Sequence, residues 1–374
     1  MILSYSFEEF VVSLLREFFN YVFVVMTKKV LIISFLLLLS AISINAQRIQ
    51  VIDGEGMPIA FVTATTPDGR FIANSDMDGW FENLGGNATV HLSQIAYKPL
   101  TVVVADIVDG KIMLEEASYD LPDVVVKPKD LLYCQTYYRL VYLNEDGPLY
   151  YRGGVIDNTY DIAKKKVSAK STHLSKGRKA YWRGLFDMLS GQYDEFARLP
   201  EKSYYNIVLE AQKRGSLTLT DVGNGRQIIA DSICQLGYIY WDADECTRTI
   251  SFDIGKWKNH VDNTVAEERK TRTIYQVYRT DSVGNSRVDD FVMSQYTNVG
   301  RHKRSGMEYV LLEESFATDY AYIDKKEFKQ LRKDNKVDKS IEELLRFEKV
   351  NKIPPLAPNL QTVIEQLFKK DRDE

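Results

Sequence analysis

The stretch VIDGEGMPIAFVTATTPDGRFIANSDMDGWFENL, residues 51 to 84, alternates apolar and polar residues in short runs that glycine, proline and aspartate interrupt. Alternation with a period of two places apolar side chains on one face of a strand, and the interrupting residues favour tight turns. The same pattern continues to about residue 117. Residues 47–120 are therefore predicted to form an antiparallel β-sandwich.

Within this stretch, the segment SDMDGWF at residues 75–81 admits two interpretations. In the first, Asp78–Gly79 is a hairpin turn, because glycine takes a positive φ and aspartate can bond its own backbone. Trp80 or Phe81 then begins the next strand. In the second, Asp76, Asp78 and Glu82 bind calcium, which takes about six to eight oxygens. The Trp-Phe pair occupies the place of the later ligands, so we favour the turn and predict no metal site.

The stretch 51–84, together with SQIAYKPL at 93–100 and LPDVVV at 121–126, resembles the carboxypeptidase regulatory-like domain. That domain is a transthyretin-like β-sandwich, common in exported proteins of the Bacteroides group. Ala96 stands where the family usually has glycine. LPDVVV resembles the segment that follows the domain in TonB-dependent outer-membrane transporters of that group. The resemblance covers about 80 residues and implies a fold and an envelope location. It implies no activity, because the module is accessory and function does not follow from fold.

The N-terminal residues 1–46 are predicted to be a targeting segment. MTKKVLIISFLLLLSAISINA at residues 26–46 has two lysines, an apolar stretch and a small final residue, the layout of a secretory signal peptide. Residues 1–25 are interpreted as an extension from too early a start codon. The alternative is a membrane anchor within residues 10–39, although charged residues interrupt that run. We predict an exported protein, either periplasmic or associated with the outer membrane.

The remainder is predicted to comprise a linker at 121–130, a larger antiparallel-sheet α+β domain at 131–324 and a helical tail at 325–374. The fold class is thus mainly β with C-terminal helices. The predicted elements include a hairpin that turns at 146–148, strands at 204–212 and 226–244, a short helix in 180–199, and a last helix with Asn359 as its N-cap after IPPLAP at 353–358.

Composition narrows the function classes. The chain of 374 residues is 45% hydrophobic and 27% charged, as in an ordinary globular protein. Its net charge of −4 gives no electrostatic case for binding nucleic acid. Cys134, Cys234 and Cys246 are too few for a disulfide framework, and both a Cys234–Cys246 bridge and free thiols remain open.

No motif for catalysis is present. His91, His173, His260 and His302 form no His-Glu-x-x-His, and the chain contains neither a Gly-x-Ser-x-Gly elbow nor a phosphate loop. We therefore predict a non-enzyme with no catalytic, cofactor-binding or metal-binding residues and no cofactor. Asp242, Asp244 and Glu245 are interpreted as an exposed hairpin end, with a cation site or an acid–base pair as the alternative.

The lysine run beginning at 164–166 and RHKR at 301–304 are interpreted as solvated strand edges, with a polyanion or glycan surface as the alternative. The predicted function is a non-catalytic envelope protein that acts by binding or assembly, with an envelope protein, a glycan or a lipid as partner. The alternatives are a lipid or lipoprotein carrier in the periplasm, a component associated with TonB-dependent transporters, and an enzyme without a recognised motif. A buried polar cluster with shifted pKa values would favour the enzyme, and a dry apolar cavity would favour the carrier.

Overall fold

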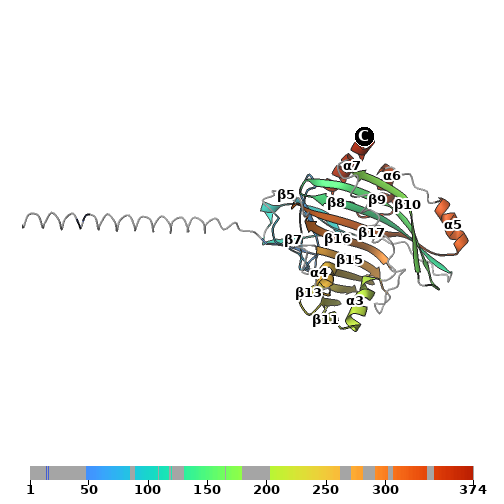
Figure 1. Cartoon of the computed structure of the whole chain (residues 1–374), viewed down its shortest axis with the longest axis horizontal. Helices are drawn as coiled ribbons and strands as arrows, with labels where there is room; N and C mark the ends of the chain where they lie inside the picture. Colours follow the sequence, from blue (N-terminus) through green and yellow to red (C-terminus); the bar gives the residue numbers. More distant parts are fainter. Residues whose placement is uncertain are drawn as a thin grey trace, which may run out of the picture. The chain divides into compact units, whose positions relative to one another are not determined.

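The computed structural model describes Leu14, Arg16 and residues 48–84, 89–107, 109–117, 119, 130–164, 166–178, 203–261, 271–280, 291–301, 306–334 and 341–373. Arg48–Glu374 form one compact unit. This unit is mainly β, as predicted, with several antiparallel sheets and a few C-terminal helices (Figure 1). The predicted signal peptide, the linker up to residue 129 and the helix predicted in 180–199 lie outside the described residues.

Two small sheets form the N-terminal sandwich. The first has the order β4 (Trp80–Phe81), β1 (Ile49–Ile52), β7 (Lys111–Met113), and the second has the order β3 (Phe71–Asn74), β2 (Thr63–Thr65), β5 (Thr89–Gln94), β6 (Tyr97–Val103). Apolar residues of both sheets share one core, among them Val51 and Phe81 from the first and Ala64 and Leu92 from the second. The pairing of β1 with β7 is parallel, a departure from a wholly antiparallel sandwich.

The turn at residues 76–80 connects the two sheets. Gly79 has the expected positive φ of 75°, but β3 and β4 belong to different sheets, so the turn is not a hairpin between paired strands. Asp76, rather than Asp78, supports the turn through its side chain. Its Oδ1 accepts the backbone N–H groups of Asp78 at 2.9 Å and Trp80 at 2.8 Å. The carboxylate at Asp76 thus has a structural role.

Two glycines of the sandwich allow the effect of crowding to be separated from that of backbone conformation. A Cβ at Gly79 would lie 2.5 Å from the carbonyl oxygen of Val51. Gly56 also has a positive φ, of 83°, but a Cβ added to Gly56 would have no atom within 4 Å. We expect Gly56→Ala to lower the free energy of unfolding by about 1 kcal/mol, and Gly79→Ala to lower it by about 2 kcal/mol or more. Urea titration measures both losses. Equal losses would contradict the crowding at Gly79.

Ten strands form one continuous antiparallel sheet (Figure 1). Its order is β10 (Lys166–Arg178), β9 (Gly147–Asp161), β8 (Leu131–Asn144), β17 (Glu308–Ile323), β16 (Phe291–Arg301), β15 (Thr271–Arg279), β14 (Thr247–Asp253), β13 (Gln235–Asp242), β12 (Arg226–Ala230), β11 (Thr218–Gly223). The predicted hairpin is confirmed, because Asn144 pairs with Gly147 across the turn between β8 and β9. Along the chain, β8 is the first strand of this sheet and β17 is the last, and the two pair with each other. The long sheet therefore depends on contacts between distant parts of the sequence.

The strand predicted at 204–212 is wrong, because these residues form helix α3 (Tyr204–Lys213). Ser203 is its N-cap and accepts the N–H of Asn206 at 3.2 Å. Val208 and Ala211, three positions apart, are buried in a core with apolar residues of β12, β13 and β14. The segment has apolar residues compatible with both periods, and its cap and its packing favour the helix.

The single strand predicted at 226–244 is also wrong, because the segment folds into two paired strands, β12 and β13. Oδ1 of Asp231 accepts the N–H groups of Ile233 and Cys234, each at 2.8 Å. This side-chain turn, a frequent use of aspartate, reverses the chain without glycine or proline.

The tail is helical, as predicted, and comprises α5 (Lys325–Asp334), α6 (Ile341–Val350) and α7 (Pro358–Asp373). A further helix, α4 (Ile254–Val261), follows β14. Between α6 and α7 runs an extended segment, residues 353–357, which we call the proline strap. Ile353, Pro354 and Ala357 of the strap are buried. Within the described residues, every helix is too short or too polar to cross a lipid bilayer.

The N-cap predicted at Asn359 is wrong. Helix α7 begins at Pro358, and proline suits a first helical turn because its missing N–H has no helical partner there. Asn359 lies inside that turn and points to the sandwich instead. Its Nδ2 donates to Oγ1 of Thr65 at 3.0 Å and to the carbonyl oxygen of Thr66 at 2.8 Å. Asn359 therefore joins α7 to the sandwich.

Substitution by aspartate distinguishes the two roles of Asn359. An N-cap accepts aspartate as readily as asparagine. Since Asn359 donates to two oxygens, we expect Asn359→Asp and Asn359→Ala each to lower the free energy of unfolding by about 1–3 kcal/mol. Gln361→Glu adds the same charge to the same end of α7 and should be close to neutral. Wild-type stability of Asn359→Asp in urea titration would show that the residue caps its helix after all.

Candidate functional site

A row of residues crosses the centre of the large sheet. Arg139 on β8 lies opposite Gly153 on β9 and opposite Glu314 on β17, and Glu314 lies opposite Gln295 on β16. We call these four residues the central row. Side chains of α6 and the backbone of the sandwich reach this row, so it is where the three parts of the compact unit meet.

Arg139 forms a buried ion-pair cluster. Its Nε donates to Oε2 of Glu314, and its Nη1 donates to Oε1 of Glu348 on α6 at 3.4 Å. The guanidinium group also lies 5.4 Å from the ring centroid of Phe316. Arg139 is only 2% exposed and both glutamates are buried. One cation thus balances two carboxylates in a largely water-free environment.

Two tyrosines complete this arrangement, which we call the Arg139 cluster. The hydroxyl of Tyr137 donates to Oε1 of Glu348 at 2.5 Å and lies 3.4 Å from the hydroxyl of Tyr151. Burial, followed by the charges nearby, raises the pKa of both phenols. Burial lowers the pKa of Arg139, but Glu314 and Glu348 outweigh that effect and the net pKa is raised. The tyrosines therefore stay neutral donors and the arginine stays charged.

Helix α6 approaches the sheet closely at the central row because Gly153 has no side chain. A Cβ at Gly153 would lie 2.7 Å from Cδ2 of Leu344. Next to it, Phe347 stacks on Tyr137 with 5.8 Å between the ring centroids. The proline strap continues from α6, and the N–H of Ile353 donates to the carbonyl oxygen of Glu348 at 2.9 Å. The position of α6 therefore sets the position of the strap.

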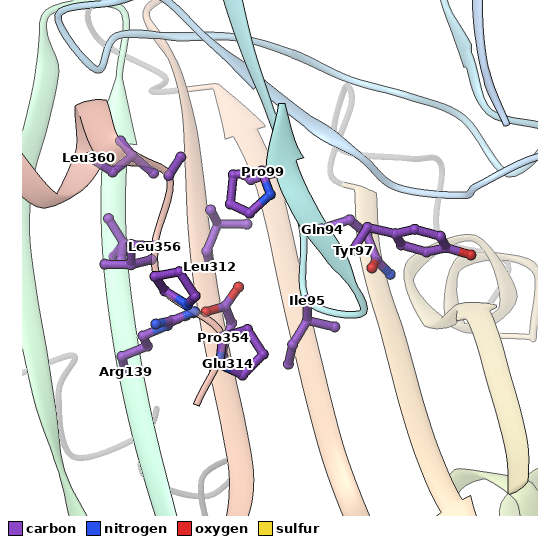
Figure 2. Close-up of a pocket in the computed structure, with 14 residues that line it drawn as sticks. Gln94, Ile95, Tyr97, Pro99, Arg139, Leu312, Glu314, Pro354, Leu356 and Leu360 are labelled. Atoms are coloured by element: carbon purple, nitrogen blue, oxygen red, sulfur yellow. Dashed lines mark hydrogen bonds and ion pairs between the residues drawn. The ribbon is translucent and has the colours of Figure 1, made fainter. Parts of the chain in front are cut away.

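A pocket lies beside the Arg139 cluster, between the sandwich, the sheet and the proline strap (Figure 2). Its charged side is formed by Arg139 and Glu314. Its other sides include Ile95 and Pro99 from the sandwich and Leu356 from the strap. We call it the junction pocket.

The sandwich side of the junction pocket is held by two glutamines. Oε1 of Gln295 accepts the N–H of Ile95 at 2.9 Å, which fixes the turn between β5 and β6 over the sheet. Oε1 of Gln94 accepts the N–H of Ala96 at 2.7 Å, so its Nε2 is the free end of the amide. Gln94 is 4% exposed, and among the described residues its Nε2 has no acceptor. The pocket wall thus contains a buried donor without a protein partner.

Asp242, Asp244 and Glu245, the acidic group noted in the sequence, do not line the junction pocket. Oδ1 of Asp242 accepts the N–H groups of Asp244 at 2.9 Å and Glu245 at 3.0 Å, as expected for the end of a hairpin. Desolvation, followed by the charges of Asp53 and Asp242, raises the pKa of Glu116 on the sandwich. In the described part of the chain, no group of three or more histidines, cysteines or acidic residues is placed to hold a metal ion.

The cysteines and histidines are not brought together either. Cys234 and Cys246 are free, and they directly precede β13 and β14, respectively. Burial raises the pKa of Cys134 to about 12, so its thiol stays protonated. His91 lies on β5 with Nδ1 2.7 Å from Oγ1 of Thr101, and burial lowers its pKa. His302 and the side chains of His173 and His260 lie outside the description.

The basic runs are only partly described. Nζ of Lys164 lies 3.4 Å from Oδ2 of Asp161, and Nη2 of Arg301 donates to Oε1 of Glu308 at 2.8 Å. Both cations are exposed members of pairs within the sheet domain. Lys164 lies just before the edge strand β10, as predicted, whereas Arg301 ends the interior strand β16, so the prediction of a strand edge is wrong there.

Sequence reasoning missed the Arg139 cluster and the junction pocket. Two signals were available: Arg139 interrupts the apolar run TYYRLVYL at 136–143, and two glutamates interrupt YVLLEESF at 309–316. A charge in the middle of an apolar strand of a large sheet has to be paired when it is buried. Pairing these two strands would have placed Arg139 near Glu314, although nothing in the sequence indicated Glu348.

The comparisons with known proteins leave the function open. No protein-family model matches the chain and no curated protein matches it, so the resemblance to the carboxypeptidase regulatory-like domain stays a prediction. Among solved structures, the chain is similar to a protein with unknown function of the DUF3598 family from Nostoc punctiforme. The identity is 8%, the TM-score is 0.16, and the match covers 69% of this chain and 94% of that chain. A similarity at this level supports no conclusion about the fold or the function of this chain.

Replacing the cation of the Arg139 cluster should be far more costly than replacing one of its anions. Arg139→Met leaves two buried carboxylates without a cation, and we expect the free energy of unfolding to fall by about 3–5 kcal/mol at pH 7. Carboxylates buried without a partner have raised pKa values in the folded state and bind protons more tightly there. Their destabilising effect therefore shrinks as the pH falls toward about 4.3, the ordinary value for glutamate.

Glu348→Gln serves as the matched control for this prediction. A glutamine at this position still accepts from Tyr137 and Arg139, and Arg139 keeps the charge of Glu314, so the loss should stay below about 1 kcal/mol. Urea titrations at several pH values measure both variants. A loss in Arg139→Met that does not change with pH, or an equal loss in Glu348→Gln, would show that the cluster is not a coupled ion-pair network.

Proposed function

We propose that this chain is a non-catalytic, exported protein of the bacterial cell envelope that binds a ligand in the junction pocket. The observation that carries this proposal is the pocket itself, with a buried ion pair on one side and apolar and proline residues on the others. Ligand sites are typically concave, mostly apolar and equipped with a few polar groups that fix orientation.

The charged groups of the pocket favour recognition over catalysis. Arg139 and Glu314 bind each other, and Glu348 is bound by Arg139 and Tyr137. A general base has to accept a proton at working pH, and a nucleophile has to be activated by a neighbouring base. Both carboxylates are already held by donors of the chain itself. The polar cluster that would have favoured an enzyme is therefore better explained as a structural support for the pocket.

The pocket is preformed, because several contacts fix the sandwich against the sheet and the tail. Besides the Ile95–Gln295 and Asn359–Thr66 hydrogen bonds, the hydroxyl of Tyr119 donates to the carbonyl oxygen of Ala317 on β17. A site that is already ordered loses little conformational entropy on binding. This rigidity supports a binding role that joins the sandwich and the sheet into one recognition surface.

The pocket suits a small ligand with polar groups better than an acyl chain. A fatty acyl chain placed against Arg139 and Glu314 would leave a charged pair in contact with hydrocarbon, which is unfavourable. The carrier alternative requires an uncharged apolar lining, whereas Arg139 and Glu314 lie in the lining of this pocket beside its leucine and isoleucine side chains. The envelope location rests on the signal-peptide pattern at 26–46 and on the family resemblance, and it makes an envelope protein or a glycan the expected partner.

A pocket-filling variant tests the proposal. Ser93 lines the pocket on β5 and is half-buried, whereas His91 lies two residues earlier on the same strand, outside the lining. The chain is purified from the periplasmic fraction of a Gram-negative host and dialysed against an envelope extract, and retained components are identified by mass spectrometry. We expect retention of a component with unchanged mass, lost in Ser93→Phe and kept in His91→Phe.

Three outcomes would contradict the proposed function. Conversion of a component to a new mass would indicate an enzyme. Retention that is equal in Ser93→Phe and the wild type would indicate that binding takes place away from the junction pocket. Recovery of the chain from the cytoplasm alone would contradict the envelope location.

A further inference from the structure

We propose that the outer edge of β11 pairs with the same edge of a second copy of this chain. β11 ends the large sheet, so its outer side has no neighbouring strand in the described part of the chain (Figure 1). Five of its six residues are exposed, and Val222 is 52% exposed. An unpaired edge presents a row of backbone N–H and C=O groups that another strand can bind. The interface is thus separate from the junction pocket.

The other outer strands of the three sheets are protected against such pairing, and β11 is not. β10, β6 and β7 contain lysines, and β6 also contains Pro99. β4 has only two residues, and β3 has no exposed residue. Lysines, prolines and short strands are common ways of keeping an edge from pairing. The sequence of β11, TLTDVG, contains no lysine, arginine or proline, so this edge is open to association.

The hairpin of β11 and β12 holds the edge in a strand conformation. Oγ1 of Thr218 donates to the carbonyl oxygen of Ala230 at 3.2 Å, and residues 218–221 pair with successive residues of β12. The register shift of the hairpin lies between Asp221 and Gly223, where Oδ1 of Asp221 accepts the N–H of Gly223 at 2.8 Å. The regular edge is therefore ordered before it binds, and its pairing costs little conformational entropy.

A second copy is the occupant because the edge is complementary to itself. Two identical strands pair antiparallel about a two-fold axis, the commonest symmetry of protein dimers. With Leu219 on the axis, the two copies of Leu219 face each other, and Thr218 of each copy faces Thr220 of the other. Apolar pairs and threonine pairs are favourable across strands. Asp221 faces Leu217 in this register, so the two aspartates do not meet.

The core beside β11 favours the same register. Leu219 is partly buried and packs against the core that contains Val208 and Ala211 of α3. On the axis, the two Leu219 side chains would bury the apolar surface that each copy leaves exposed. Thr218 and Thr220 lie on the opposite face, because successive side chains of a strand alternate. The core of one copy would thus continue into the core of the other.

The interface is small, so the dimer should be weak. One strand pair buries less than the roughly 1,200 Å² of a stable interface, and we expect a dissociation constant between about 10 μM and 1 mM. Sedimentation velocity of the purified chain across this range measures it. A chain that remains monomeric at about 1 mM would overturn the proposal.

Charge substitutions on the exposed face of β11 test the surface. Thr218→Lys combined with Thr220→Lys places lysines opposite each other in both pairs, and the dissociation constant should rise at least about tenfold. Thr218→Lys combined with Thr220→Glu places opposite charges face to face and should restore the dimer. Thr101→Lys combined with Thr362→Lys adds the charge of the two-lysine variant at exposed positions of β6 and α7 and should have no effect. Wild-type dimerisation of the two-lysine variant of β11 would show that the copies associate elsewhere.

Cysteine cross-linking tests the register. In a chain with Cys234→Ser and Cys246→Ser, Leu219→Cys brings two thiols face to face, within the Cα separation of about 4.4–6.8 Å that a disulfide requires. Thr220→Cys faces Thr218 of the other copy, and its own copy lies about 8 Å away, too far for a bridge. We expect mild oxidation to link Leu219→Cys into a dimer and to leave Thr220→Cys unlinked. Linkage of neither variant, or of Thr220→Cys as readily as Leu219→Cys, would overturn the proposed pairing.

Discussion

The ion-pair cluster of Arg139 with Glu314 and Glu348 is the interaction on which the rest of this structure depends. It joins residues that are 175 and 209 positions apart in the sequence. Arg139 lies on β8 and Glu314 on β17, the first and last strands of the large sheet in chain order. Glu348 lies on helix α6 of the tail. Buried charges are costly to desolvate and are tolerated only with good geometry and additional hydrogen bonds. A cluster of this kind therefore specifies one pairing of β8 with β17 and one position of α6, because other arrangements would leave a buried charge without a partner.

The geometry of the candidate site follows from that constraint. Once α6 is fixed over Gly153, the proline strap has to leave it along the sheet, and α7 then reaches the sandwich through Asn359. On the other side of Glu314, Gln295 fixes the turn between β5 and β6. The junction pocket is the space where these constraints meet, so its shape derives from the central row and not from a flexible loop. A preformed pocket of this origin is suited to recognition of a small group.

Local features of the fold were predictable from the sequence, and features that depend on distant contacts were not. The sandwich follows from period-two alternation and from turn residues such as Gly79, and the β8–β9 hairpin follows from Asp146–Gly147. Helix α3 was predicted as a strand because its apolar residues fit both periods, and its N-cap Ser203 was overlooked. Asn359 has the residue type and the place of an N-cap, but a donor contact to Thr65 and Thr66 on the sandwich decides its role.

We infer that the Arg139 cluster couples the sandwich, the sheet and the tail into one unit. Hydrogen exchange followed by mass spectrometry in the wild type and in Arg139→Met tests it most directly. We expect peptides containing Ile95 of the sandwich and Ile353 of the strap to lose protection together in the variant, although Ile95 makes no hydrogen bond to Arg139. Loss of protection confined to α6 and the strap, with the sandwich exchanging as in the wild type, would contradict it.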